Sequence, residues 1–239
     1  MQSWGTRSRF TERDTEMEPS KSGVAGILCA ALGRHRSEDV SDLAALHMGV
    51  RVDNEGTMAN DYHTAGGEHE DGGPNGIRTA SGDLYRTDGR LTGEISRRYY
   101  LAGADFLVGL ESENEAFLRE LEAALRAPVW QLSLGRKSFL SSVPIYLPYE
   151  GGIRQLPLSE ALEAEPWPLR PLAWRPPREG TAKRLRLVLE TDFRGPARPE
   201  TRSDQPRGAA FQDRTFGPRA IVQASCDKEY TDVPQPAHA

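Results

Sequence analysis

A long stretch without apolar periodicity interrupts the chain, and it constrains the fold more than any other feature. From Thr57 to Ser96 the sequence is crowded with Gly, Asp, Asn and Thr, and its apolar residues recur at neither helical nor strand spacing. A loop of this length inside a compact domain is usually either functional or disordered. We therefore expect its ordered form to be a hairpin, or thumb, that projects from a globular body.

The region before this stretch predicts a helix followed by a strand. Residues Pro19 to Gly33 carry apolar side chains at helical spacing, with Ser20 or Ser22 available to cap the start and Gly33 to close the end. A short helix over Ser41–His47 is expected next. Alternation over Met48–Asp53 then predicts a strand.

The region after the stretch repeats the pattern in reverse. Apolar and aromatic residues over Arg97–Glu111 predict one or two strands. Ser112 and Glu115 have the spacing of a capping box, and the apolar stripe behind them predicts a helix that Pro128 ends. Residues Val129–Leu134 then predict a further strand. This order is α+β, and a ferredoxin-like (RRM-like) unit would need one more strand before the first helix.

The rest of the chain predicts a smaller β-rich part. With 23 Gly and 17 Pro, the composition favours a loop-rich protein over a helical bundle. Pro-rich connections precede two further strand candidates at Arg184–Leu189 and Ala220–Val222. We expect a first domain over residues 1–148, a β-rich part over 149–230 and a flexible tail over 231–239.

The formal net charge of −5 argues, at first sight, against a nucleic-acid partner, because affinity for phosphate comes mainly from Lys and Arg. The charge is unevenly distributed. Residues 175–219 carry eleven basic and six acidic side chains, which makes that stretch locally positive. Runs of this kind are usually solvated faces, and contact with nucleic acid or a neighbouring subunit is the alternative.

Cysteine usage and hydropathy point to a reducing, cytoplasmic location. Cys29 and Cys226 are too few for a disulfide scaffold and have no metal-ligand spacing. No apolar run is long enough to span a membrane, and no export signal is visible, so no membrane partner is expected. His63 and His69 match no zinc pattern, and we expect neither a metal nor a cofactor.

Two motifs near the N-terminus have the chemistry of RNA contact. Residues Gln2 to Arg9 combine an amide, a hydroxyl, an indole and two guanidinium groups, which could read an exposed base and hold its phosphates. The alternative is an ordinary turn with Trp4 packed in the core. Lys21 and Ser22 begin a helix, where free N–H groups attract anions. The alternative there is a capped helix with a solvated Lys.

Two motifs in the middle of the chain leave similar choices open. Tyr62 and His63 could act as an acid and base in metal-free RNA cleavage, or could stack on bases. The turn Gly135-Arg136-Lys137-Ser138 resembles the end of a phosphate-binding P-loop, but Trp130 stands where the first Gly belongs, which excludes a nucleotide triphosphatase. Arg136 and Lys137 could contact an RNA phosphate, and the alternative is a charged turn exposed to solvent.

Several separated segments together resemble the CasD family, the RAMP-superfamily subunit that binds the 5′ handle of the guide RNA in type I-E CRISPR Cascade. The segments are Gln2-Ser3-Trp4-Gly5, Pro19 to Val24, Asp61-Tyr62-His63-Thr64, Arg98 to Ala102 with Phe106 to Val108, and Leu134 to Ser138. Their order over residues 1–148 carries the resemblance. In the family, a strand ending in Leu-x-Gly-Pro precedes the Gln-Ser-Trp-Gly motif. Its absence here suggests a start codon assigned too far downstream, and the alternative is a protein that tolerates an incomplete sheet.

The resemblance implies a non-catalytic subunit that binds the 5′ handle of the crRNA. Its expected partners are the backbone RAMP subunit and the large subunit of Cascade, with target DNA met through the complex. The alternative is a metal-independent endoribonuclease that uses Tyr62, His63 and Lys21. The residues expected to contact RNA are Gln2, Ser3, Trp4, Gly5, Arg7, Arg9, Lys21, Ser22, Tyr62, His63, Thr64, Arg97, Tyr99, Arg136, Lys137 and Ser138.

Overall fold

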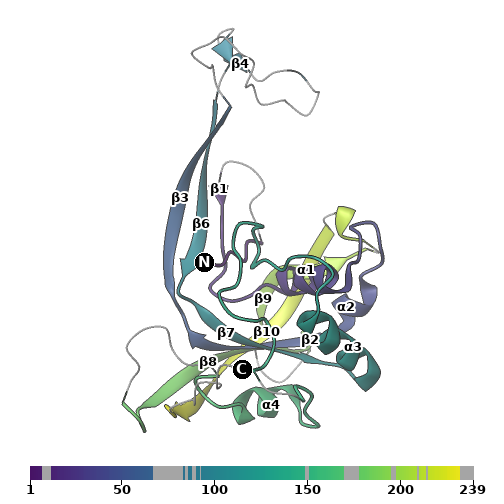
Figure 1. Ribbon diagram of the computed structural model, residues 1–239, viewed down its shortest axis with the longest axis vertical. Coiled ribbons are helices and arrows are strands. Elements are labelled where there is room, and N and C mark those ends of the chain that lie inside the picture. The colour runs from purple at the N-terminus through teal and green to yellow at the C-terminus, as the bar shows by residue number, and fades with distance from the viewer. Residues whose placement is uncertain are drawn as a thin grey trace.

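A five-stranded antiparallel sheet forms the body of the protein (Figure 1). The computed structural model describes residues 1–6, 12–66, 83, 86–87, 90–91, 93–148, 151–169, 178–194, 198–208, 210–213 and 215–231. The strand order is β7-β2-β8-β10-β9. The strands are β2 (His47–Asn54), β7 (Asp105–Glu111), β8 (Ala182–Glu190), β9 (Glu200–Arg207) and β10 (Thr215–Glu229). Strands β2 and β7 come from residues before 148, and β8, β9 and β10 come from residues after it. The N-terminal and C-terminal parts of the chain therefore share one sheet and one core.

Helices cover both faces of this sheet. On one side lie α1 (Lys21–Leu32), α2 (Ser41–Ala45) and α3 (Glu115–Arg126), and on the other side lies α4 (Leu158–Ala164) (Figure 1). A 3-10 turn, η1 (Phe211–Asp213), precedes β10. Side chains alternate accordingly, so Val50 packs under α1 and α3 while Leu187 packs toward α4. The helix predicted over Pro19 to Gly33 is confirmed as α1, with Ser20 capping the start and Gly33 in the left-handed region.

A hairpin projects from the body, as expected for part of the aperiodic stretch (Figure 1). Its strands β3 (Thr57–Gly66) and β6 (Gly93–Ala102) pair in continuous antiparallel register from Thr57 opposite Ala102 to Gly66 opposite Gly93. A short strand, β1 (Glu12–Arg13), pairs parallel with β6. Further along lie β4 (Arg86–Thr87) and β5 (Arg90–Leu91), which pair with each other. We call β3, β6 and β1 the thumb base; most of residues 67–92 lies outside the described residues.

Strand β2 contains a charged residue, Arg51, although helices cover both faces of the sheet. The hydrogen-bond partners of Arg51 explain why this charge is tolerated. The side chain is fully buried and points toward α4. Its Nε donates to Asp53 Oδ1 at 2.7 Å, and its two terminal nitrogens donate to the carbonyl oxygens of Leu162, Glu165 and Pro166 at 2.6 to 2.8 Å. Leu162 lies in the last turn of α4, and Glu165 and Pro166 follow directly after the helix. Their carbonyl oxygens have no partner within α4 and need one elsewhere. Arg51 therefore joins α4 to the sheet.

Two local predictions are wrong. Residues 129–134 form no strand, because the N–H groups of Val129 and Trp130 donate to the carbonyls of Ala31 and Ala30 and so satisfy the end of α1. The cap of α3 is not Ser112: Asn114 Oδ1 accepts from the N–H of Phe117, and Ser112 accepts from Asn114 instead. Both errors concern the hydrogen-bond partner of an unpaired backbone group at the end of a helix.

Candidate nucleic-acid interface

The N-terminal segment is built into the thumb base. The N–H of Gln2 donates to Leu101 O at 2.9 Å and the N–H of Leu101 donates back to Gln2 O at 2.8 Å. The Gln2 amide also donates to Ala104 O and accepts from the Trp4 indole. Trp4 is buried against Ile27 and Leu101. The alternative reading of Trp4 as a core residue is therefore confirmed, and its indole is not free to stack on a base.

The turn at residues 135–139 packs directly on this segment. Ser3 N–H donates to Leu134 O at 3.0 Å, and Ser3 Oγ contacts Tyr99 O at 3.3 Å. Gly135 has φ +88°, and a Cβ added there would lie 1.7 Å from Ser3 O. Only glycine fits such a position. Three segments that are far apart in the sequence therefore meet at the thumb base: residues 2–5, β6 and residues 135–139.

Arg136 spans this junction. Its Nη2 donates to Tyr99 O at 2.8 Å, and its guanidinium lies 5.3 Å from the ring centre of Phe139. Burial and the nearby charges of Arg98 and Arg13 lower the pKa of Arg136, against the opposing effect of Asp61. Lys137 and Ser138 beside it are exposed. The turn thus presents one partly buried cation and one free cation at the surface.

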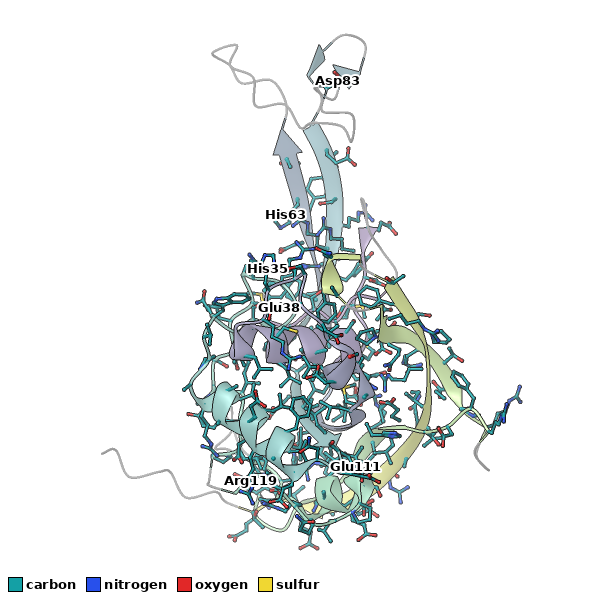
Figure 2. The ribbon with its side chains drawn as sticks, turned by 90° about the vertical axis from the view of Figure 1, so that its right-hand side faces the viewer. His35, Glu38, His63, Asp83, Glu111 and Arg119 are labelled. Atoms are coloured by element: carbon teal, nitrogen blue, oxygen red, sulfur yellow. The ribbon has the colours of Figure 1, made fainter. Side chains whose placement is uncertain are left out.

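The thumb base divides the predicted contact residues between two faces. Side chains alternate along a strand, so neighbours in sequence point to opposite sides. Tyr62 lies opposite Arg97 across the two strands, and Asn60 lies opposite Tyr99, so these four residues share one face with Thr64. His63 shares the other face with Asp61, whose Oδ2 lies 3.5 Å from His63 Nε2. His63 lies on the projecting hairpin, outside the body (Figure 2).

Lys21 lies in a buried network of the body and does not reach the thumb. Its Nζ donates to both oxygens of Glu190, at 2.8 and 3.0 Å, and its own N–H donates to Asp204. Arg219 also pairs with Asp204. Burial lowers the pKa of Lys21, against the opposing effect of Glu190. The expected phosphate contact is thus corrected: two carboxylates already occupy the Lys21 ammonium and the start of α1, although Ser22 remains partly exposed.

This geometry separates the three groups of the endoribonuclease alternative. Tyr62 and His63 point away from each other across the hairpin, and Lys21 is buried and 3% exposed in the body. A general acid and base must both reach the same reacting atoms. The three side chains do not form one site in this structure.

Two arginines at the thumb base were missed by the sequence analysis. Arg98 follows Arg97 and therefore points to the opposite face, which the strand prediction could have shown. Arg13 gave no signal, because its place beside Arg98 depends on the parallel pairing of β1 with β6. Arg7 and Arg9 lie outside the described residues.

Part of the locally positive stretch forms ion pairs within the protein, among the residues that the structure describes. Arg186 binds Glu18 and Glu55, Arg202 also binds Glu18, and Arg219 binds Asp204. The pairs with Glu18 join the segment before α1 to strands β8 and β9 of the sheet. Within the described ranges there is no group of three or more potential metal ligands, and no helix there is long and apolar enough to cross a membrane.

Comparison with known proteins identifies the family of this chain. A model described as CRISPR-associated protein (Cas_Cas5) matches residues 1–222. The chain belongs to the Cas5 family. A solved structure described as a Cas protein has 42% sequence identity to this Cas5 chain and a TM-score of 0.65, covering 94% of this chain and 89% of that one. A chain of a CRISPR RNA-guided surveillance complex has 32% identity and a TM-score of 0.72, covering 99% of this chain and 90% of its own length.

A curated relative is the CRISPR system Cascade subunit CasD of Escherichia coli strain K12. It is 33% identical over 163 residues, which cover 62% of this chain and 66% of the relative. The matched region thus falls just short of two thirds of that protein's length. The mixed α+β architecture agrees with the chain of the surveillance complex over nearly the whole Cas5 chain.

Proposed function

We propose that this Cas5 protein is the subunit of a type I-E Cascade complex that binds the 5′ handle of the crRNA. The observation that carries the proposal is the meeting of residues 2–5, β6 and residues 135–139 at the thumb base, with Lys137 and Arg136 at its surface. Cations beside a projecting hairpin suit the backbone of a single-stranded RNA. The relationship to CasD and to a surveillance-complex chain supports this reading.

We assign the two faces of the thumb base different partners. The face with Tyr62 also carries Met58 and Ile95, all strongly exposed at 47 to 62%. Exposed apolar groups of this kind suit a protein contact. We propose that this face meets the backbone RAMP subunit, while the face with His63 and the turn at 135–139 meets RNA. The large subunit would contact the assembled particle in the cytoplasm, and target DNA would be recognised through guide pairing.

We also propose that the sheet is a ferredoxin-like RAMP core. Along the chain, α1, β2, β7 and α3 follow one another in the α-β-β-α order of a ferredoxin-like unit, with the thumb between β2 and β7. Strand β2 pairs antiparallel with β7 on one side and with β8 on the other.

The binding proposal is tested with the purified chain and two labelled RNAs of equal length. One carries the repeat-derived 5′ handle and the other a scrambled handle. We expect at least about tenfold tighter binding of the native handle, since base contacts supply the discrimination. Equal affinity for the two RNAs would contradict handle recognition.

We propose that the subunit does not cleave RNA, because its candidate acid, base and cation are separated as described above. In EDTA, repeat RNA should remain intact over hours with the wild-type chain, and His63→Ala should change only binding or assembly. A general acid–base pair contributes about a hundred- to ten-thousand-fold in rate. Site-specific cutting by the wild type that is lost in His63→Ala would establish the endoribonuclease instead.

A further inference from the structure

Three arginines from separate segments converge on one face of the thumb base. Arg13 of β1 and Arg98 of β6 are register partners on adjacent strands. Side chains of register partners point to the same face. Asp61 of β3 lies on the other side of Arg98 in the same row. Two guanidinium groups therefore stand side by side on the face that carries His63.

Arg136 approaches the same face from the 135–139 turn. Its hydrogen bond to Tyr99 O anchors it on β6, and Phe139 of this turn contacts the ring of Tyr100 at 5.6 Å between centroids. Tyr100 and Arg98 lie two residues apart and so share a face. The effect of Arg98 and Arg13 on Arg136 noted above agrees with this proximity.

Among the described residues, no acidic side chain forms an ion pair with any of these three arginines. Several arginines of the body differ in this respect, since Arg34, Arg51, Arg186, Arg202 and Arg219 bind carboxylates. Asp61, which lies nearest in the row, is beside His63. Like charges on adjacent strands destabilise a sheet, so the cluster has the features of a site for an external anion.

We propose that Arg13, Arg98 and Arg136 together bind one phosphodiester group of the guide RNA. The proposal rests on the function proposed above and adds the site and the chemical group. A guanidinium presents a planar fork of donors that matches two phosphate oxygens. Arg136 is held in place by its contacts with Tyr99 and Phe139, so little ordering is needed when the phosphate arrives.

The test compares Arg98→Gln and Arg13→Gln with Arg97→Gln in the full-length chain. Arg97 was predicted from the sequence to contact RNA, but it lies on the face that is assigned above to the protein partner, so it is not part of the proposed RNA site. It is the matched control, because it lies on the same strand and loses the same charge but points to the opposite face. We expect each of the first two changes to weaken binding of handle RNA by about tenfold or more. Each should lower the slope of log affinity against log salt by about 0.7, and Arg97→Gln should do neither.

A second arm locates the phosphate itself. Handle RNAs with one neutral methylphosphonate linkage are scanned for the position at which neutralisation weakens binding to the wild-type chain. Arg98→Gln should remove the effect of that one linkage and leave the others unchanged. The melting temperature of this variant should stay close to that of the wild type, since the repulsion from Arg13 and the attraction to Asp61 are removed together.

The outcomes separate the two proposals. If the wild type does not distinguish native from scrambled handle RNA, the proposed function fails. If it does distinguish them, but Arg98→Gln and Arg13→Gln bind like Arg97→Gln, the function stands and the three-arginine site is overturned. A methylphosphonate effect that persists at every position in Arg98→Gln also overturns it.

Discussion

At the scale of single residues, Gly135 allows the turn at residues 135–139 to pack directly on Ser3. Its φ of +88° and the 1.7 Å approach of an added Cβ to Ser3 O make two separate demands for glycine. Gly135→Ala should lower the free energy of unfolding by about 3 kcal/mol, from left-handed strain together with overpacking. Denaturant unfolding measures the loss.

Gly151→Ala is the control for that prediction. Gly151 also has a positive φ, +74°, but nothing lies within 4 Å of an added Cβ. This change should cost only the strain, about 1 to 2 kcal/mol. Equal losses of unfolding free energy in the two variants would mean that the close approach to Ser3 adds nothing to the cost of Gly135→Ala.

At the scale of elements, Arg51 joins α4 to the central strand. Arg51→Met should destabilise the protein by about 3 to 5 kcal/mol, because it leaves Asp53 buried without its partner. Asp53→Asn in the same chain should recover part of the loss. Urea unfolding of the two single variants and the double variant measures this coupling. If the losses of unfolding free energy in the two single variants simply add in the double variant, Arg51 and Asp53 do not stabilise each other.

The same contact predicts a dependence on pH. Burial raises the pKa of Asp53, and Arg51 opposes that rise. Without Arg51 the folded-state pKa of Asp53 should rise further above its unfolded value of about 3.9. The ionised form is then the costly one, so the stability deficit of Arg51→Met should shrink as the pH falls from 7 toward 5. A deficit that is constant over this range would argue against an uncompensated carboxylate.

At the scale of the whole molecule, the body and the thumb have separate roles. The clusters around Val50 and Leu187 include no residue of β3, and β6 contributes Leu101 to a third cluster at the junction. Replacing residues 67–92 by a two-residue Asn-Gly turn should therefore leave stability within about 0.5 kcal/mol of wild type. Incorporation into a Cascade complex, followed by size-exclusion chromatography, should fail. Normal incorporation would show that the distal thumb makes no essential contact.

Local patterns in the sequence were sufficient for several elements. The helix predicted over Pro19 to Gly33 and the strand around Val50 depend on caps and periodicity within a few residues, and both were predicted correctly. The projecting hairpin could be expected because Thr57–Ser96 lacked core-forming spacing. Strand β9 was missed, since Pro206 and its polar residues match an edge strand rather than a buried one.

Only the tertiary structure decided which groups are free to bind. Lys21 and Arg136 look alike in sequence, as cations beside Ser and Gly, yet Glu190 holds the first inside the body and no described acid pairs with the second. Trp4 was equally suited to stack on a base or to fill a core, and Leu101 and Ile27 place it in the core. The sequence by itself determined the chemistry available. Contacts between distant segments decided its exposure, because burial and charge pairing depend on neighbours that local spacing does not specify.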